Sequence, residues 1–196
     1  MSAAFPELLR DLLNGVLQLS PEQVAALEAH YELLLKWNRV LSLTSVDDPA
    51  RLVERHYCES LFVGSCLPSG ELSIADIGSG PGFPGIPLAI FRPECRVVLI
   101  ESHQRKAVFL KEATRKLPNV RVLAARAESV QESFDWLVSR AVSYEDLAPI
   151  LEKLAPNSLL LTGDEEPPTK RINWVRSVKL PWGRNRFVRI GNRSAG

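Results

Sequence analysis

The first seventy residues carry apolar positions at helical spacing. A capping box with proline at the first helical position, at residues 20–23, opens a helix of roughly 20 residues. Asp48 and Pro49 open another helix in the same way. The apolar residues of these segments recur every three or four positions: Leu8, Leu9, Leu12, Leu13, Val16, Leu17, Leu27, Tyr31, Leu34, Leu35, Leu52, Val53, Leu61 and Phe62. The pattern predicts an N-terminal group of amphipathic helices.

From residue 72 onward, short apolar runs alternate with amphipathic stretches. The apolar runs are residues 72–77, 96–101, 120–124, 134–139 and 158–162, and the stretches between them are 84–91, 104–117, 128–133 and 145–154. This alternation predicts a mostly parallel sheet with helices on both faces. Residues 174–180 and 186–190 have no helix between them, so they predict an antiparallel C-terminal hairpin at the edge of the sheet.

The composition is that of a soluble globular chain. The 196 residues are 45% hydrophobic and 24% charged, which excludes disordered, collagen-like and coiled-coil proteins. We expect a helical subdomain at 1–70 and an α/β domain at 71–196, packed as one unit. No apolar run reaches the roughly 20 residues that cross a bilayer, and no signal-peptide pattern is present, so we expect a cytoplasmic protein without membrane contact. Cys58, Cys66 and Cys95 lack metal-ligand spacing, and we expect reduced thiols and no metal site.

The charges are distributed unevenly. Residues 1–166 hold 16 Lys and Arg against 23 Asp and Glu, whereas residues 167–196 hold eight basic residues and no acid. Residues 105–126 hold seven basic residues and a single acid. Two such regions on one face would attract a polyanion, usually nucleic acid; the alternative is an ordinary solvated surface. On the first interpretation, charge reversal at four positions should weaken nucleic-acid binding and flatten its salt dependence: Lys170, Arg171, Arg184 and Arg186.

A glycine-rich loop follows the first predicted strand. Asp76 precedes Gly78, Gly80 and Gly82. Glycine lets a ligand approach the backbone and permits positive φ, and ligands of such sheets bind at the carboxyl ends of the strands. The G-x-G-x-G spacing differs from the G-x-G-x-x-G fingerprint of dinucleotide sites. Glu101 ends the second strand, 23 residues after Gly78, where its carboxylate can accept hydrogen bonds from two ribose hydroxyls.

The acid before the glycines separates two nucleotide ligands. A carboxylate at Asp76 repels the pyrophosphate of NAD but attracts the ammonium of S-adenosylmethionine, directly or through water. The segment therefore favours S-adenosylmethionine as cofactor. The alternatives are a glycine turn without a ligand and, for Glu101, a solvated strand end.

Two later strand ends face the same edge of the predicted sheet. Ala127 and Glu128 follow the third strand, where an amide and a carboxylate can contact an adenine edge. The alternative for Glu128 is a helix-start acid favoured by the dipole. Arg140 ends the fourth strand beside the same crevice. Its alternative role is a salt bridge with Glu101 or Glu128.

Several short segments resemble, in the same order, those of a known family. They are Trp37-Asn38-Arg39, Leu43-Thr44-Ser45, Arg55-His56, the run GSGPGFPGIP at 78–87, Arg126-Ala127-Glu128 and Ser139-Arg140-Ala141. The chain resembles the bacterial small-subunit ribosomal RNA guanine-N7 methyltransferases, once named glucose-inhibited division protein B, over roughly residues 8–190.

The resemblance implies a class I, Rossmann-like methyltransferase fold behind an N-terminal helical cap, with S-adenosylmethionine as donor. It implies that the acceptor is N7 of one guanine in the decoding-region loop of 16S rRNA, position 527 in the usual rRNA numbering. It also implies that the enzyme acts on 16S rRNA or the 30S subunit, and we expect a monomer. By residue matching, five positions fall on cofactor contacts of the family: Gly78, Phe83, Ala127, Glu128 and Arg140.

The chain departs from the family's pattern at several positions, and one of them, Thr162, lies at the mouth of the implied site. The family has lysine where this chain has Thr162, and Asp where it has Glu59. Because that lysine would meet RNA or the target base, one alternative function is a cofactor- and RNA-binding module with weakened catalysis. A second alternative, motivated by the fold alone, is a nucleotide-dependent oxidoreductase.

Guanine N7 carries a free lone pair, so the implied reaction needs no general base. The protein's part is to hold N7 about 3–3.5 Å from the methyl carbon, in line with the leaving sulfur. Arg105 and Lys106 are candidates for positioning RNA, and Asn38 and Thr44 for shaping the guanine pocket. The alternatives are surface charge for the two cations and a helix cap for Asn38.

Three further residues of the matched region are interpreted as packing residues. Trp37 and Phe62 are expected to be core aromatics rather than base-stacking platforms, and His56 a satisfied histidine on an apolar helix.

Overall fold

The computed structural model describes residues 4–140, 142–165, 167–168 and 171–193. The N-terminal helices are α1 (Phe5–Leu13), α2 (Pro21–Asn38), α3 (Pro49–Leu52), the π-helix η1 (Val53–Cys58) and α4 (Glu59–Cys66). The strands are β1 (Ser73–Ile77), β2 (Arg96–Ile100), β3 (Val120–Leu123), β4 (Trp136–Arg140), β5 (Asn157–Thr162), β6 (Ile172–Lys179) and β7 (Phe187–Arg193). Between them lie α5 (Gly85–Phe91), α6 (Gln104–Ala113), the 3₁₀ turn η2 (Ala127–Ser129) and α7 (Tyr144–Leu154).

The predicted helix starts are confirmed by their caps. The Ser20 hydroxyl accepts the Gln23 N–H at 3.2 Å, and the Gln23 side chain accepts the Ser20 N–H at 2.9 Å, which is a complete capping box. The Asp48 carboxylate accepts the Arg51 N–H at 2.8 Å at the start of α3. Each cap satisfies backbone donors that a helix leaves free at its first turn.

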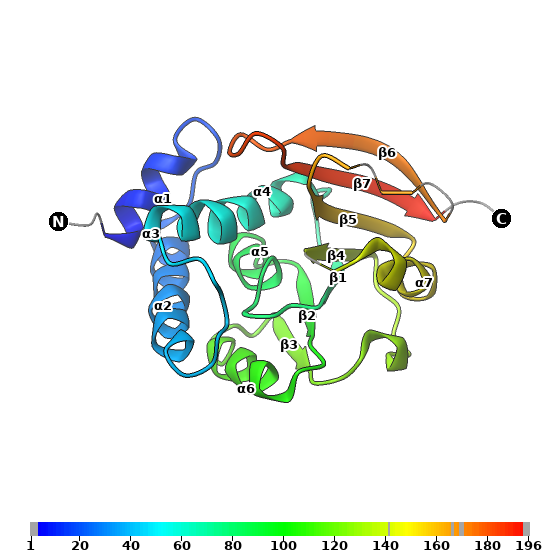
Figure 1. The fold of residues 1–196 in the computed structure, drawn as a ribbon, viewed down its shortest axis with the longest axis horizontal. Helices are drawn as coiled ribbons and strands as arrows, with labels where there is room; N and C mark the ends of the chain where they lie inside the picture. Colours follow the sequence, from blue (N-terminus) through cyan, green and yellow to red (C-terminus); the bar gives the residue numbers. More distant parts are fainter. Residues whose placement is uncertain (1–3, 141, 166, 169–170, 194–196) are drawn as a thin grey trace.

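The seven strands of the described chain form one sheet in the order β3-β2-β1-β4-β5-β7-β6. The first five are parallel, and β7 and β6 add antiparallel to β5. The strand order reverses between β1 and β4, and ligands of open α/β sheets bind beside such a switch point. The predicted fold class, with its helical cap and antiparallel C-terminal hairpin, is confirmed (Figure 1). The division at residue 70 falls in the loop between α4 and β1 and stays a prediction.

Side chains of the sheet alternate between two apolar layers. One layer contains Ile74 and Val138 with residues of the N-terminal helices, α5 and α6; the other contains Ala75 and Leu137 with residues of α7. In Figure 1, α7 lies across the sheet from α4 and α5. Because the N-terminal helices share a core with the sheet, they cover one face of it rather than forming a separate appendage.

The two aromatic residues interpreted as core residues have ring partners in this core. Trp37 packs against Phe109 with ring centroids 5.7 Å apart, and Phe62 against Trp182 at 6.1 Å. Trp182 also donates its indole N–H to the Leu12 carbonyl at 2.9 Å, which ties the hairpin turn to α1. Within the described ranges, no helix combines the length and the apolar character that crossing a bilayer needs.

Two predicted helices are shorter than expected. The stretch 104–117 is helical only to Ala113; at its end the Leu110 carbonyl accepts both the Thr114 N–H at 2.9 Å and the Thr114 hydroxyl at 2.8 Å. The stretch 128–133 contains only the single turn η2, where the Ser129 hydroxyl takes the Arg126 carbonyl at 2.7 Å. In both places a Thr or Ser hydroxyl hydrogen-bonds a carbonyl three or four residues earlier, beside the backbone N–H of the same residue.

Candidate functional site

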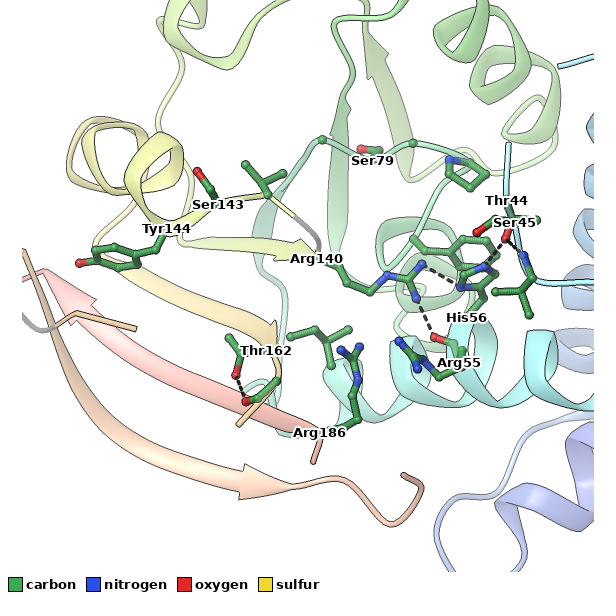
Figure 2. Close-up of a pocket in the computed structure, with 18 of the residues that line it drawn as sticks. Thr44, Ser45, Arg55, His56, Ser79, Arg140, Ser143, Tyr144, Thr162 and Arg186 are labelled. Carbon is green, nitrogen blue, oxygen red and sulfur yellow. Dashed lines mark hydrogen bonds between the residues drawn. The ribbon is translucent and has the colours of Figure 1, made fainter. Parts of the chain in front are cut away.

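A cavity of about 1030 Å³ lies at the carboxyl ends of β1, β4 and β5. Its walls come from the glycine loop after β1, the loop after α2, the π-helix η1, the start of α7 and the β6–β7 hairpin. Figure 2 shows side chains from these separate segments converging on one space. The crevice predicted at this edge of the sheet is therefore present, and its volume suits a nucleoside-sized ligand together with a second group.

The glycine loop is built from left-handed backbone. Gly78, Gly80 and Gly82 have φ of 69°, 56° and 96°, a region that L side chains rarely adopt. A Cβ on Gly78 would lie 2.7 Å from a methyl of Val142, and one on Gly82 would lie 2.4 Å from the end of Ile86. Gly78 and Gly80 line the cavity, whereas Gly82 is buried beneath the loop. The loop thus presents bare backbone to the cavity.

Glu101 holds this loop from the neighbouring strand. One carboxylate oxygen accepts the Gly80 N–H at 2.8 Å and the other accepts the His103 N–H at 2.7 Å. Glu101 is buried but lines the cavity, and each of its oxygens retains acceptor capacity for a ribose hydroxyl. We call residues 78–83 together with Glu101 the glycine wall.

Asp76 lies beneath the glycine wall and is not among the cavity-lining residues. It is fully buried, and its Oδ2 accepts the Gly85 N–H at 3.0 Å. Its Oδ1 has no hydrogen-bond partner in the part of the chain that the structure describes. Burial raises the pKa of this carboxyl to about 7, against the opposing effect of the Gly85 N–H. The contact of Asp76 with an ammonium stays a prediction, which this orphaned oxygen supports.

Ala127 and Glu128 lie in η2, after the outermost parallel strand β3. Ala127 is buried, the Glu128 side chain is exposed, and neither lines the cavity. The Glu128 carbonyl accepts a hydrogen bond from Lys153 at 2.8 Å. Their predicted contact with adenine stays a prediction.

Arg140 extends from β4 to the π-helix. Its Nη1 donates to the Arg55 carbonyl at 2.6 Å and its Nη2 to His56 Nδ1 at 2.8 Å. The guanidinium lies 5.5 Å from the centre of the Phe83 ring, on which His56 stacks at 4.8 Å (Figure 2). Among the described residues no ion pair joins Arg140 to Glu101, so the salt bridge considered from the sequence is wrong for that partner and equally for Glu128. Ala141 lies outside the described residues.

His56 is a neutral residue of the cavity wall. Burial, followed by the positive charges of Arg140 and Arg55, lowers its pKa to about 3. Burial also lowers the pKa of Arg140, to about 10, so the guanidinium remains protonated at neutral pH. His56 has hydrogen bonds at both ring nitrogens. It is therefore a satisfied histidine, as predicted, but it lines the cavity rather than only packing in the core.

The π-helical geometry of η1 brings this part of the wall into place. Residues 53–58 follow i→i+5 hydrogen bonding, and the Glu59 N–H continues it to the Glu54 carbonyl. Such a wide turn is common at functional sites. Here Arg55 and His56 both line the cavity, and the Arg55 carbonyl accepts Arg140. Sequence reasoning missed this feature because its hydrophobic spacing is the same as that of an ordinary helix.

The buried carboxylate of Glu59 holds Arg186, a further cation that lines the cavity. Arg186 donates through Nε to Oε1 at 3.1 Å and through Nη2 to Oε2 at 2.6 Å. Arg55 approaches the same Oε1 at 3.4 Å. Glu59 is fully buried, whereas Arg186 lines the cavity. Sequence reasoning chose Arg186 only as one of four basic residues for nucleic-acid binding and gave Glu59 no site role; an acid in an apolar helix segment was the available signal for Glu59. We call Thr44, Arg55, His56, Arg140 and Arg186 the arginine wall.

Asn38, the last residue of α2, shapes the site from behind. Its Oδ1 accepts the N–H groups of Leu43 and Thr44 at 2.7 and 2.9 Å, and its Nδ2 donates to the Thr44 carbonyl at 3.1 Å. Asn38 does not line the cavity, but the loop that it holds, residues 43–46, does. Its position therefore favours shaping of the site over a simple helix cap.

The two cations predicted to position RNA both lie in the first turn of α6, but only one of them lines the cavity. Lys106 lines the cavity, whereas Arg105 is exposed outside it. Thr162, where the resemblance implies a lysine, also lines the cavity and donates to the Gly163 carbonyl at 3.2 Å.

Comparison with known proteins identifies the family. The family model described as rRNA small subunit methyltransferase G matches residues 23–162. The chain belongs to this family. A ribosomal RNA small subunit methyltransferase G of Xanthomonas campestris is 44% identical over 143 residues, covering 70% of this chain and 66% of that protein. The one of Aquifex aeolicus is 40% identical over 169 residues, covering 83% and 85%. The predicted family is thus confirmed.

Solved structures agree on the fold. A crystal structure of a SAM dependent methyltransferase from Aquifex aeolicus has a TM-score of 0.59 at 19% identity and covers 78% of this chain and 97% of that one. This likeness shows the fold alone, and it agrees with the class I methyltransferase architecture. Membership of the rRNA small subunit methyltransferase G family favours a methyltransferase over the oxidoreductase alternative. The chain spans just under two thirds of the Xanthomonas relative that it matches.

Proposed function

We propose that this protein is an S-adenosylmethionine-dependent methyltransferase that transfers a methyl group to N7 of a guanine in 16S ribosomal RNA. The observation that carries the proposal is the cavity, in which a bare-backbone glycine wall faces an arginine wall across the switch point of the sheet. The family assignment supports the reaction class and the substrate.

The residues present fit the proposed cofactor. Gly78, Gly80, Phe83 and Glu101 line the cavity with backbone, an apolar ring and a ribose-binding carboxylate. The unpartnered buried oxygen of Asp76 suits a cationic ligand group near the loop. When bound, S-adenosylmethionine supplies an electrophilic methyl group on a positively charged sulfur. The chain's own residues then have to bind the cofactor and the RNA, orient them relative to each other, and exclude water.

The arginine wall contains no general base, and the reaction requires none. His56 is neutral with both ring nitrogens engaged, so it neither takes nor gives a proton in the neutral range. Guanine N7 attacks with its own lone pair, and the enzyme's contribution is alignment. Lys106, Arg140 and Arg186 supply positive charge around the cavity, which suits the phosphates flanking a nucleotide.

Exposed cations outside the cavity suit a longer stretch of RNA. They lie on and after α6 and on the hairpin: Arg105, Lys111, Arg115, Lys116, Arg176, Lys179 and Arg184. Arg189 is buried and donates to the Ser177 hydroxyl at 2.8 Å, so the basic C-terminus holds fewer available cations than its composition indicates. Of the four residues chosen from the sequence, Arg171 pairs with Glu152 at 2.8 Å and Arg186 with Glu59, while Lys170 lies outside the described residues. Arg184 remains the exposed candidate.

Incubation with tritiated cofactor and small-subunit particles from cells that lack the modification tests the proposal. We expect label in 16S RNA at a single guanine, and the same assay with naked 16S RNA identifies the preferred substrate. Binding of cofactor without transfer to either substrate would support the weakened module instead. Thr162→Lys then tests the replaced residue, because restored transfer would assign the weakness to that position. A cytoplasmic monomer acting on the 30S subunit or its RNA remains part of this proposal.

A further inference from the structure

The hydrogen bonds around His56 have a direction that chemistry fixes. A guanidinium has donors and no acceptor, so the 2.8 Å bond from Arg140 makes His56 Nδ1 the acceptor. The ring is neutral, and its proton is therefore on Nε2. Nε2 lies 2.8 Å from the Thr44 hydroxyl oxygen. His56 must donate to Thr44 and not accept from it.

Thr44 is thereby left as a donor. Its hydroxyl oxygen accepts from His56 and also from the Val46 N–H at 3.2 Å, which occupies both lone pairs. The hydroxyl proton has no acceptor among the residues that the structure describes. The Asn38 side chain fixes the backbone of Thr44, because it accepts the Thr44 N–H and donates to the Thr44 carbonyl. Thr44 is half-buried and lines the cavity beside His56 (Figure 2).

We propose that the Thr44 hydroxyl donates a hydrogen bond to O6 of the target guanine and so selects guanine over adenine. This inference rests on the proposed function. The guanine edge presents two acceptors, N7 and O6, whereas adenine presents the N7 acceptor and an N6 amino donor. A hydroxyl that can only donate pairs with O6 and opposes the amino group. It carries one proton, so N7 stays unpaired for attack.

The cations of the cavity are less suited to this task. Arginine and lysine normally pair with N7 and O6 together, and a donor on N7 would occupy the lone pair that attacks. Arg140 is already committed to the Arg55 carbonyl and His56, and Arg186 to Glu59. The forced orientation of Thr44 thus gives Arg140 and His56 a positioning role in base selection.

Replacing the hydroxyl and the base oxygen separately and together tests the contact. The RNA carries either guanine or 2-aminopurine, which keeps N7 but lacks O6, at the position mapped by the transfer assay. For Thr44→Val we expect kcat/KM on guanine RNA to fall roughly tenfold, the loss of one neutral hydrogen bond, and no further fall on 2-aminopurine RNA. Thr44→Ser keeps the donor and should retain most of the activity on guanine.

Two controls separate selection from structure. Ser45→Ala removes the neighbouring cavity hydroxyl, and any effect that it has should fall equally on both RNAs. Calorimetry with S-adenosylhomocysteine should give the same affinity for Thr44→Val and the parent protein. The inference is overturned if Thr44→Val slows both RNAs by the same factor, or if it leaves guanine methylation unchanged. Absence of transfer by the parent protein would instead contradict the proposed function, and this inference would fall with it.

Discussion

The two walls of the cavity are built in different ways. The glycine wall consists of one loop and one carboxylate, within 24 residues of each other, and its hydrogen bonds are to backbone amides. The arginine wall assembles side chains from four segments spread between Thr44 and Arg186, and buried polar contacts hold them. The comparison teaches that the first wall depends on local backbone geometry, whereas the second depends on long-range pairs.

Removing the buried carboxylate should break the arginine wall most severely. Glu59→Gln leaves Arg186 and Arg55 without their shared countercharge. Loss of one member of a buried pair typically costs about 3–5 kcal/mol, and we expect a fall of that order in the free energy of unfolding by urea. Glu132→Gln, which breaks the exposed pair with Arg121, is the matched control and should cost less than about 1 kcal/mol. Equal losses in the two variants would contradict a dominant role of the buried pair.

The glycine wall also has one long-range support, which pH can reveal. His30 of α2 donates to the Pro81 carbonyl at 3.1 Å and accepts from the Tyr57 hydroxyl at 2.9 Å. Burial lowers the pKa of His30 to about 4. As pH falls, the unfolded chain therefore protonates this histidine at a higher pH than the folded chain does. The free energy of unfolding decreases as pH falls from about 6.5 toward 4.

His30→Gln should remove this dependence, a difference on the order of 3 kcal/mol between pH 7 and pH 4. Urea unfolding of the two proteins across this range measures it. His56 and the carboxyl groups contribute to both curves and cancel in the comparison. Parallel curves for the variant and the parent would show that His30 does not carry the effect.

Asp76 should make cofactor affinity depend on pH. Its pKa of about 7 means that the carboxyl is neutral below pH 7 in the free protein. A cationic ligand prefers the ionised form, so affinity should fall about tenfold for each pH unit below 7 and level off above it. Asp76→Asn should bind more weakly at pH 8 and show no such slope. Calorimetry at several pH values checks both, and a slope retained in Asp76→Asn would assign it to another group.

The smallest expected effects concern exposed cations of the C-terminal hairpin and the residue that precedes it. Arg184 is exposed, whereas Arg171 is paired with Glu152. Arg184→Gln should weaken RNA binding a few-fold and lower the slope of log K against log salt by about one. Arg171→Gln should change that slope less. The reverse order would mean that the Arg171 pair opens when RNA binds.

The difference between the walls also explains what the sequence could predict. The strands, the glycine loop and the cavity-facing position of Glu101 were predicted from the spacing of apolar residues, glycines and acids along the chain, because this spacing is a local property. The sequence could not reveal the π-helix or the pair of Glu59 with Arg186, since these residues are 127 positions apart. The role of Asn38 in shaping the guanine pocket stays a prediction, and its hydrogen bonds to the loop of Thr44 could not be predicted, because they join residues of two different segments.

The chemical identity of the methylated nucleoside tests the central claim most directly. RNA from the transfer assay is digested to nucleosides and analysed by mass spectrometry against standards. The account predicts that the transferred label elutes as 7-methylguanosine, because N7 attacks with its own lone pair and His56, the histidine of the arginine wall, is neutral with both ring nitrogens hydrogen-bonded. Label in another methylated nucleoside, or no label in RNA under conditions where the cofactor binds, would contradict it.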